Sequence, residues 1–239
     1  MRRSMAAAMA CVALSSGVVL GDTFNLASDW SETSNPMGRW TLREDASALP
    51  HVDAWQRNLG GWGTFQPGWA RSEDDNTRLP FFFRSNGTEQ FACDFVQGDI
   101  VVHTWDGVNG VGSGQASVAF DVGLTGTVSV SGSAWMGRDI GRAADWELRH
   151  NGALLSAGSL FSGDAFSRNT PFDLSAGSGG AAAVTNIPVI AGDTIELRLV
   201  TRSSFGDFVG LNLSISNVPA PGVVSLLAMS VLAAARRRR

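Results

Sequence analysis

The chain has 239 residues and a mass of 25.2 kDa, which is enough for one domain with tails. Its composition, with 44% hydrophobic residues, 17% charged residues and 28 glycines, excludes a disordered polyelectrolyte or a coiled coil. All 18 basic residues are arginine and tyrosine is absent, which excludes enzymes that depend on a Walker A lysine, a Schiff-base lysine or a tyrosine acid. Six arginines lie in the two tails, so the rest of the chain has 12 arginines against 22 acidic residues, and this net charge of −10 argues against a nucleic-acid partner.

Residues 1–21 have the pattern of a secretory signal peptide. A basic start is followed by an apolar stretch, which we expect to be helical, and small residues precede a polar sequence. Val19 and Gly21 suit the −3 and −1 positions of a signal peptidase site, so we expect cleavage before Asp22, with an earlier cut near Ser16 as the alternative.

The chain has two cysteines. Cys11 would end a lipobox in a lipoprotein, but the apolar run before it is short and continues well beyond it, which favours an ordinary signal peptide. Cys93 is then alone in the mature chain, so no intramolecular disulfide is expected. A small core residue is the favoured interpretation of Cys93 over a reactive thiol.

The segment from Asp22 to about Asn86 is irregular and rich in tryptophan, proline, glycine and asparagine. Short extended pieces are predicted at Gly38–Leu42, Val52–Trp55 and Thr64–Ala70, separated by turn sequences. Five of the eight tryptophans lie between residues 30 and 69.

Tryptophan rings can stack on sugars, and they can equally fill a core. Trp62 and Trp69 follow glycine-rich and Pro-Gly sequences that resemble loop tips, so we expect these two to be exposed ligand platforms. For the other tryptophans, burial is the favoured expectation.

The acidic loop Glu73–Asn76 has oxygen ligands that could hold Ca²⁺. It lacks the spacing of an EF-hand, so a solvated charge cluster is favoured, and we expect no cofactor and no metal. Phe81–Phe83 is expected to be a strand buried on both faces, with an exposed adhesive edge as the alternative.

Beyond Asp99 a period of two dominates, and no segment there has helical length and period. The predicted strands are Gly98–Thr104, Gln115–Val122, Gly126–Ala134, Trp146–His150, Ala153–Leu160, Val184–Val189, Thr194–Val200 and Phe208–Ser216. Asn151-Gly152 predicts a type I′ hairpin turn. About ten short strands without helices predict an all-β sandwich, and we favour a jelly roll, over residues 22–216.

No catalytic constellation is evident. The three histidines, His51, His103 and His150, have no metal-ligand spacing, and His150 is expected to be solvated at the hairpin. The chain has no nucleophile elbow and no strand with the paired carboxylates of a glycoside hydrolase. We therefore expect a protein without enzymatic activity.

The C-terminal region, residues 217–239, has a Pro-Ala-Pro sequence, a largely apolar stretch at Val223–Ala235 and four arginines. Thirteen residues of helix span only about 20 Å, but counting from Val218 gives 18 uncharged residues, just enough for the ~30 Å hydrocarbon core. The arginines would remain on the cytoplasmic side. A buried core helix is the alternative interpretation.

This tail resembles the bacterial PEP-CTERM sorting signal, which is also catalogued as an ice-binding protein C-terminal domain, a name that implies no ice binding. The residues that carry the resemblance are Val218, Pro219, Ala220, Pro221, Arg236, Arg237, Arg238 and Arg239. Ala220 replaces the glutamate that is commonest between the two prolines. The resemblance implies export, transient anchoring in the inner membrane, processing by an exosortase-type membrane peptidase, and delivery to the cell surface or an extracellular matrix.

The stretch from about Val101 to Ser216 is similar to jelly-roll domains of the carbohydrate-binding-module or galactose-binding kind that precede such tails. The motifs are Trp105–Gly110, Gly126–Gly132, Arg149–Gly152 and Ala191–Ile195. The expected function is a non-catalytic, surface-delivered binding or matrix protein with an extracellular polysaccharide as the expected ligand. A degenerate polysaccharide-active enzyme and a purely structural coat protein are the alternatives.

Overall fold

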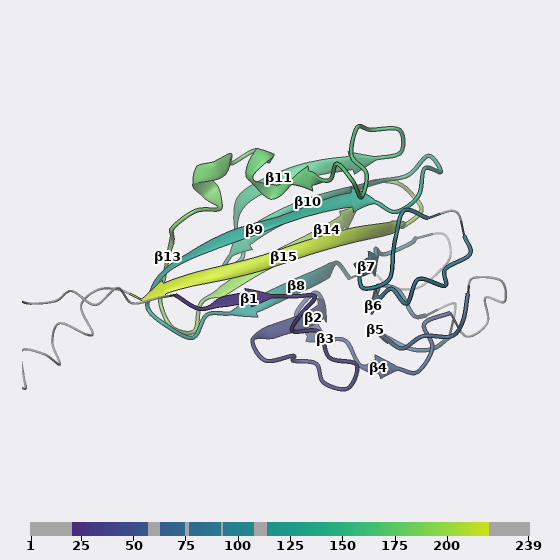
Figure 1. Cartoon of the computed structure of the whole chain (residues 1–239), viewed down its shortest axis with the longest axis horizontal. Coiled ribbons are helices and arrows are strands. Elements are labelled where there is room, and N and C mark those ends of the chain that lie inside the picture. Colours follow the sequence, from purple (N-terminus) through teal and green to yellow (C-terminus); the bar gives the residue numbers. More distant parts are fainter. Residues whose placement is uncertain (1–20, 57–62, 75–76, 92, 108–113, 220–239) are drawn as a thin grey trace, which may run out of the picture.

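The computed structural model describes residues 21–56, 63–74, 77–91, 93–107 and 114–219. Two antiparallel sheets pack face to face and form a β-sandwich (Figure 1), which confirms the predicted fold class. The predicted signal helix and the predicted Val223–Ala235 helix lie outside these residues. Within the described ranges we find no helix of the length and hydrophobicity needed to cross a bilayer.

The strands of the larger, nine-stranded sheet are β1 (Thr23–Asn25), β4 (His51–Val52), β5 (Gly68–Ala70), β6 (Phe81–Arg84), β7 (Ile100–His103), β9 (Gly126–Met136), β12 (Phe172–Asp173), β13 (Ile187–Val189) and β15 (Phe208–Pro219). Those of the six-stranded sheet are β2 (Trp40–Glu44), β3 (Ser47–Ala48), β8 (Ala116–Asp121), β10 (Ala143–His150), β11 (Ala153–Phe161) and β14 (Thr194–Thr201). Two 3₁₀ turns, η1 (Leu174–Ala176) and η2 (Ala181–Ala183), follow β12.

From β7 to β10, consecutive strands alternate between the two sheets. After the β10–β11 hairpin the chain returns to the larger sheet through β12 and β13, then crosses to β14 and back to β15. The resulting neighbours, β9–β15–β7 in one sheet and β11–β10–β14–β8 in the other, give the double-sheet order of a jelly roll. The topology agrees with the one that the sequence favoured.

The β10–β11 hairpin turns at Asn151 and Gly152, whose φ angles of 49° and 80° confirm the predicted turn. The Asp193 carboxylate accepts hydrogen bonds from Asn151 Nδ2 at 2.8 Å and, through its other oxygen, pairs with His150 Nε2 at 2.9 Å. The Asn151 bond, followed by those from Ile190 N–H and His150, lowers the pKa of Asp193 to about 2. His150 is therefore bound to the β13–β14 turn, and the expectation that it is merely solvated is wrong.

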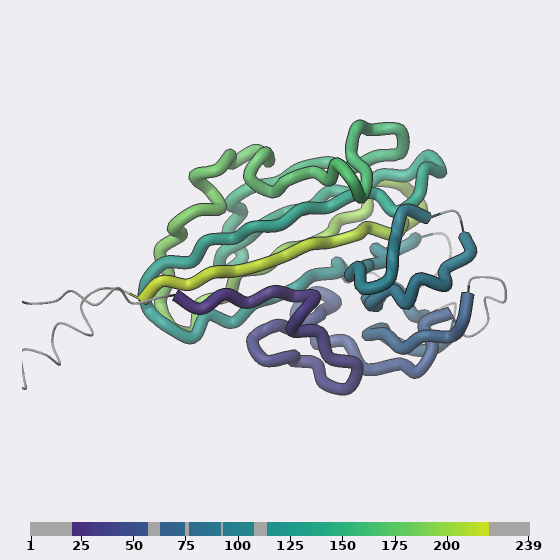
Figure 2. Tube along the Cα trace, viewed as in Figure 1, coloured from purple at the N-terminus to yellow at the C-terminus, as the bar shows by residue number. Residues whose placement is uncertain are grey.

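The N-terminal segment widens both sheets and is more regular than its sequence predicts. β2 and β3 extend the smaller sheet beyond β8, while β6, β5 and β4 extend the larger sheet beyond β7 (Figure 2). Phe82 faces the core between the sheets, whereas Phe81 and Phe83 face a second core that also contains Trp55 and Phe208. β6 is thus buried on both faces, as predicted.

Both ends of the described chain lie at one end of the sandwich. Asp22 N–H donates to Asn217 Oδ1 and Asn217 N–H donates to Asp22 O, each at 2.9 Å, and β1 then pairs with β15 from Thr23 onward. β15 continues three residues past the predicted domain boundary at 216, so Val218 and Pro219 belong to the sheet. The other residues of the predicted sorting signal lie outside the described residues.

Candidate binding cleft

Of the two tryptophans expected at the surface, the structure describes only Trp69. Trp69 is only 3% exposed, because it lies on β5 and its indole N–H donates to Ser31 O at 3.1 Å. Its backbone pairs with Phe82, so the Pro-Gly turn before it leads directly into the sheet and not to a loop tip. The expectation of an exposed platform at Trp69 is wrong. Trp62 lies outside the described residues.

A cleft of about 450 Å³ lies at the opposite end of the sandwich from Asp22 and Pro219. Three segments form it: the turn after β9, the loop after β11, and the stretch before β7 that contains Cys93 and Asp94. Met136 at the end of β9 pairs with Val209, while Gly126 at its start pairs with Pro219, which places the cleft and the chain ends a full strand length apart. We call these the cleft end and the terminal end.

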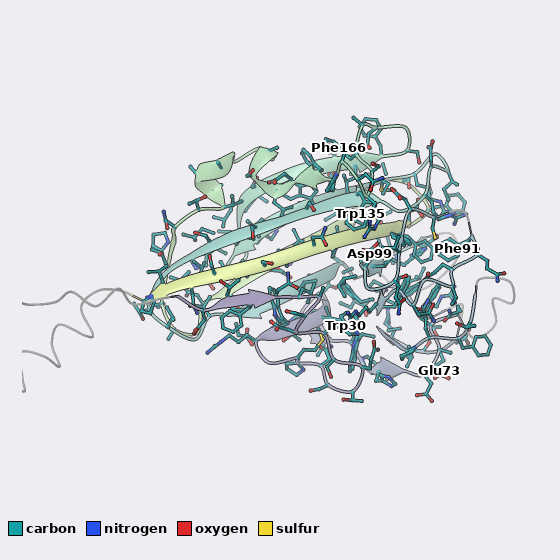
Figure 3. All side chains as sticks on the ribbon, viewed as in Figure 1. Trp30, Glu73, Phe91, Asp99, Trp135 and Phe166 are labelled. Atoms are coloured by element: carbon teal, nitrogen blue, oxygen red, sulfur yellow. The ribbon has the colours of Figure 1, made fainter. Side chains whose placement is uncertain are left out.

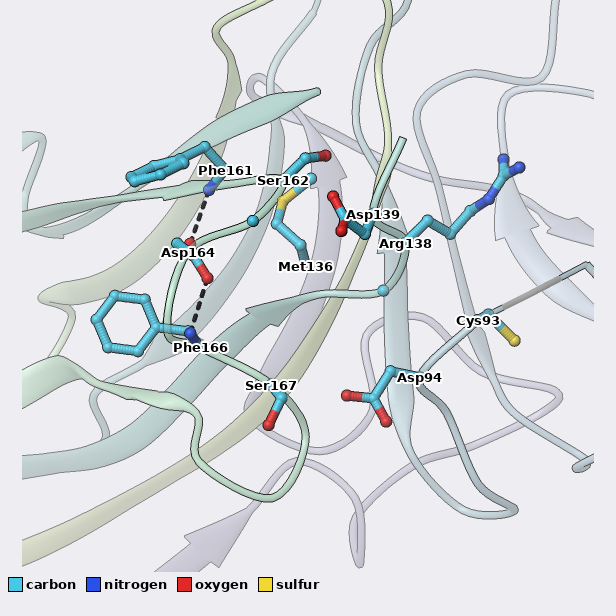
Figure 4. A pocket seen from close by; sticks show the side chains of 12 residues that line it. Cys93, Asp94, Met136, Arg138, Asp139, Phe161, Ser162, Asp164, Phe166 and Ser167 are labelled. Carbon is cyan, nitrogen blue, oxygen red and sulfur yellow. Dashed lines mark hydrogen bonds between the residues drawn. The ribbon is translucent and has the colours of Figure 1, made fainter. Parts of the chain in front are cut away.

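Asp164 organises the loop after β11. Its carboxylate accepts hydrogen bonds from the backbone N–H groups of Phe161 and Phe166, each at 2.8 Å (Figure 4). Ser162 Oγ accepts two more, from Ile140 N–H at 3.1 Å and Arg142 N–H at 2.9 Å, and this joins the loop to the β9–β10 turn. These four hydrogen bonds restrain the wall of the cleft that the loop forms.

Arg168 joins the same loop to the opposite wall. Its backbone N–H donates to Asp94 Oδ2 at 2.7 Å, and its guanidinium donates to both oxygens of Asp99 at 2.7 and 3.1 Å. The hydrogen bond to Asp99 raises the pKa of Arg168 further above its usual value. Trp135 Nε1 donates to Asp94 O at 2.9 Å, which anchors this wall to β9; Asp99 and Trp135 lie at this end of the molecule in Figure 3.

The lining combines one open aromatic ring with carboxylates and hydroxyls. Phe161 is 52% exposed, although large apolar side chains on strands are usually buried. The exposed side chains of Asp94 and Asp139 turn toward the 162–167 loop, whereas Arg138 turns away from it (Figure 4). The Arg138 guanidinium lies 5.4 Å from the centre of the Phe91 ring. The open part of the cleft is therefore acidic.

Cys93 lines the cleft but has the properties of an inert thiol. Burial, together with the charge of Glu89, raises the pKa of the Cys93 thiol, which favours the protonated form over the nucleophilic thiolate. The side chain is half-buried and packs against the second core. The favoured interpretation of Cys93 as a packing residue agrees with this environment.

His103 at the end of β7 and Asp207 just before β15 are both buried. His103 Nδ1 bonds to Thr104 O at 2.8 Å, and burial lowers the pKa of His103 to about 3, so the ring is neutral. Asp207 Oδ1 accepts from the N–H of Phe208 at 2.8 Å, whereas its Oδ2 has no hydrogen-bond partner among the described residues. Burial raises the pKa of Asp207 to about 6.

The acidic loop proposed as a calcium ligand is only partly described. Glu73 Oε1 accepts a hydrogen bond from Asp53 N–H at 2.9 Å, while Asp75 and Asn76 lie outside the described residues. Elsewhere in the described ranges no three histidine, cysteine or acidic side chains come together as a metal site would require.

The residues of the cleft were not predicted from the sequence. They come from three loops separated by tens of residues, and no spacing joins them. Phe161 has the outward parity of β11, one residue after the buried Leu160. Single exposed apolar side chains are common on protein surfaces, so this parity did not by itself mark a binding position.

Comparisons with known proteins add little to this description of the cleft. No family model matches the chain, and no curated protein matches it. One similar solved structure is that of the Clostridium thermocellum endo-1,4-β-D-xylanase 10B CBM22-1–GH10 modules complexed with xylohexaose, with 12% sequence identity and a TM-score of 0.29. The match covers 84% of this chain and 29% of that structure, and a likeness this remote defines no family.

Proposed function

We propose that the protein is an exported β-sandwich, delivered to the cell surface or matrix, which binds a polysaccharide in the cleft and does not convert it. The observation that carries the binding role is a cleft lined by the exposed aromatic residue Phe161 together with the carboxylates of Asp94 and Asp139. The ring offers a stacking face, and carboxylate oxygens are strong acceptors for sugar hydroxyls.

Export and sorting are proposed from the sequence, and the position of the chain ends supports them. Asp22, the expected first residue after signal cleavage, is hydrogen-bonded to Asn217, close to the expected processing region at Val218–Pro221. A tail that anchors the protein at the terminal end would leave the cleft end facing outward. Under this proposal an exosortase-type peptidase would act on the tail.

The test is retention of the protein by a panel of polysaccharides. Both sheets and both cores lie between Gly21 and Pro219, so residues 22–219 are the folding unit to use. We expect retention without release of reducing ends. Phe161→Ala should weaken it by about 1–3 kcal/mol, the magnitude for a base stacked on an aromatic side chain.

Phe65→Ala is the matched control, because Phe65 is 62% exposed and does not line the cleft. Asp139→Asn should also weaken retention, and Asp53→Asn, at an exposed carboxylate outside the cleft, should not. Release of reducing ends would replace this proposal with an enzymatic one. Failure of every polysaccharide to retain the protein would overturn it.

A further inference from the structure

The terminal end of the sandwich carries apolar side chains that belong to neither core. The strand register places Pro188, Thr127 and Val218 side by side on β13, β9 and β15, and β13 and β15 both end at this tip (Figure 1). Pro188 is exposed, Val218 is 48% exposed, and Ile190, the next outward residue after Pro188, is 61% exposed. Neither Ile190 nor Val218 is part of either core. We call Pro188, Ile190 and Val218 the terminal patch.

The two turns beside the patch are uncharged as well. The β8–β9 turn (residues 123–125) and the β13–β14 turn (residues 190–192) are joined by a hydrogen bond from Ala191 N–H to Thr125 Oγ1 at 3.3 Å. None of these six residues has an ionisable side chain. The next residue, Asp193, is only 8% exposed, because its carboxylate is taken up by the hairpin contacts described above. The two turns therefore form a tip without outward charge.

Charged side chains lie at the rim of this tip. Arg39 Nη1 donates to Asp121 O at 3.2 Å, and its guanidinium lies against Gly123 of the β8–β9 turn. Asp121 is exposed, with Arg43 Nη2 3.8 Å from its Oδ1, and Asp22 is exposed too. An apolar centre with arginine at its rim suits a membrane interface, because guanidinium groups can pair with lipid phosphates while apolar side chains enter the headgroup region.

The chain leaves the sandwich at this patch, and its length limits how far the patch can be from a membrane. β15 ends at Pro219 and the terminal arginines begin at Arg236, so residues 220–235 are the 16 uncharged residues between them. As a helix they would span about 24 Å, short of the ~30 Å hydrocarbon core. The sequence alone allows Val218 and Pro219 to complete the span, but both lie in the sheet. A chain anchored by this segment has no spare length, so its terminal end is held at the bilayer surface.

This short tether removes the need for strong binding by the patch itself. Three residues separate Pro219 from the apolar stretch that starts at Val223, and even fully extended they keep the two within about 15 Å. At such a distance the effective concentration of the bilayer surface is high. Three apolar side chains, too few to hold a free protein on a vesicle, can then decide which way the anchored sandwich faces.

We propose that the terminal patch rests in the headgroup region of the membrane that the tail spans. The inference rests on the proposed anchoring by the tail and deepens it, because it assigns a membrane contact to the folded domain. This contact keeps residues 218–221 at the membrane surface, where the proposed peptidase would act. It also directs the cleft end away from the bilayer.

The test uses residues 22–239 reconstituted into vesicles of phosphatidylethanolamine and phosphatidylglycerol. Cys93→Ala removes the one cysteine of this segment. Ala191→Cys then carries a fluorophore at the tip, and Ser204→Cys carries it in the exposed β14–β15 turn at the cleft end. Lipids with a spin label just below the headgroup quench a fluorophore that touches the bilayer. We expect the label at Ala191 to be quenched at least about twofold more strongly than the label at Ser204.

Charges placed on the patch should abolish the contact. Ile190→Glu with Val218→Glu should reduce the quenching at Ala191 to the level of the cleft-end label, because burying two carboxylates in the headgroup region is unfavourable. Ile140→Glu with Val96→Glu is the matched control, since these side chains are 41% and 46% exposed at the cleft end. This control should leave the quenching at Ala191 unchanged.

Flotation of the vesicles measures anchoring separately from the contact. An anchored chain whose labels at Ala191 and Ser204 are quenched equally overturns this inference and leaves anchoring by the tail intact, whereas a chain that does not float with the vesicles overturns both. Quenching of the double glutamate variant at the level of the parent also overturns the inference. Disulfide cross-linking through Ala191→Cys without quenching by lipid overturns it in favour of a second copy of the chain on the patch.

Discussion

Asp207 is the described acidic residue whose surroundings most disfavour its charged form. It is 1% exposed, and its Oδ2 has no hydrogen-bond partner among the described residues. Its pKa is raised from 3.8 to about 6, so the folded state takes up a proton more readily than the unfolded chain. The resulting stabilisation is complete below about pH 4 and is lost as the pH rises through about 6.

We expect Asp207→Asn to remove this loss. Relative to the variant, the wild type should become less stable by up to about 3 kcal/mol between pH 4 and pH 7.5, because each pKa unit corresponds to about 1.4 kcal/mol. His103, whose pKa burial lowers to about 3, makes both proteins more stable as the pH rises over this range, so the prediction concerns the difference between the two curves. Urea unfolding at several pH values measures both curves, and parallel curves for the two proteins would contradict the assignment.

At the scale of the secondary-structure elements, the β10–β11 hairpin allows backbone strain to be tested without a steric clash. Gly152 has a φ of 80° and no heavy atom within 4 Å of the place that a Cβ would occupy, so a side chain there meets strain but no steric clash. Gly152→Ala should therefore destabilise the fold by about 1–2 kcal/mol. Gly152→Asn is the matched comparison, since asparagine tolerates this conformation, and equal losses from both variants would count against the strain argument.

The strand β5 depends on Trp69 as a core side chain. Trp69→Ala should destabilise the fold by about 3–5 kcal/mol, the usual cost of emptying a large aromatic site. Phe65→Ala, three residues before β5 and exposed, should stay within about 0.5 kcal/mol of the wild type. Thermal and urea unfolding compare the two. A small effect at Trp69 would mean that its ring does not support the core.

Most long strands follow from the sequence because one face of each is buried and the alternation is strict, as in Gly126–Met136 and Thr194–Thr201. Trp69 was misplaced because a Pro-Gly turn before a strand of only three residues has the same local sequence as a loop tip. The cleft could not be predicted, because Asp94, Asp139 and Phe161 come to line it only through the arrangement of three segments that are distant in the sequence.

For the whole molecule, the proposed sorting makes a prediction about the full-length protein in its cell. Deleting residues 222–239 should convert a membrane-associated precursor into a released protein, because the only apolar stretch after the signal peptide would be removed. Fractionation of cells that carry either form measures this. Unchanged membrane partition would contradict it.

The companion measurement is the C-terminus of the mature protein. Mass spectrometry of surface material should find chains that end near Val218–Pro221. A mature pool that retains all four terminal arginines would contradict sorting by cleavage. It would not contradict anchoring of the protein in the membrane by its tail.

The central position of β15 has a mechanical consequence. This strand has β9 along one side and β7 and β1 along the other, and its hydrogen bonds run perpendicular to its axis. A pull on Pro219 along that axis therefore loads the two flanking ladders in shear, so their hydrogen bonds share the force and do not open one by one. If the protein is pulled between a ligand at the cleft end and an anchor beyond Pro219, β15 would carry the load from one end of the sandwich to the other.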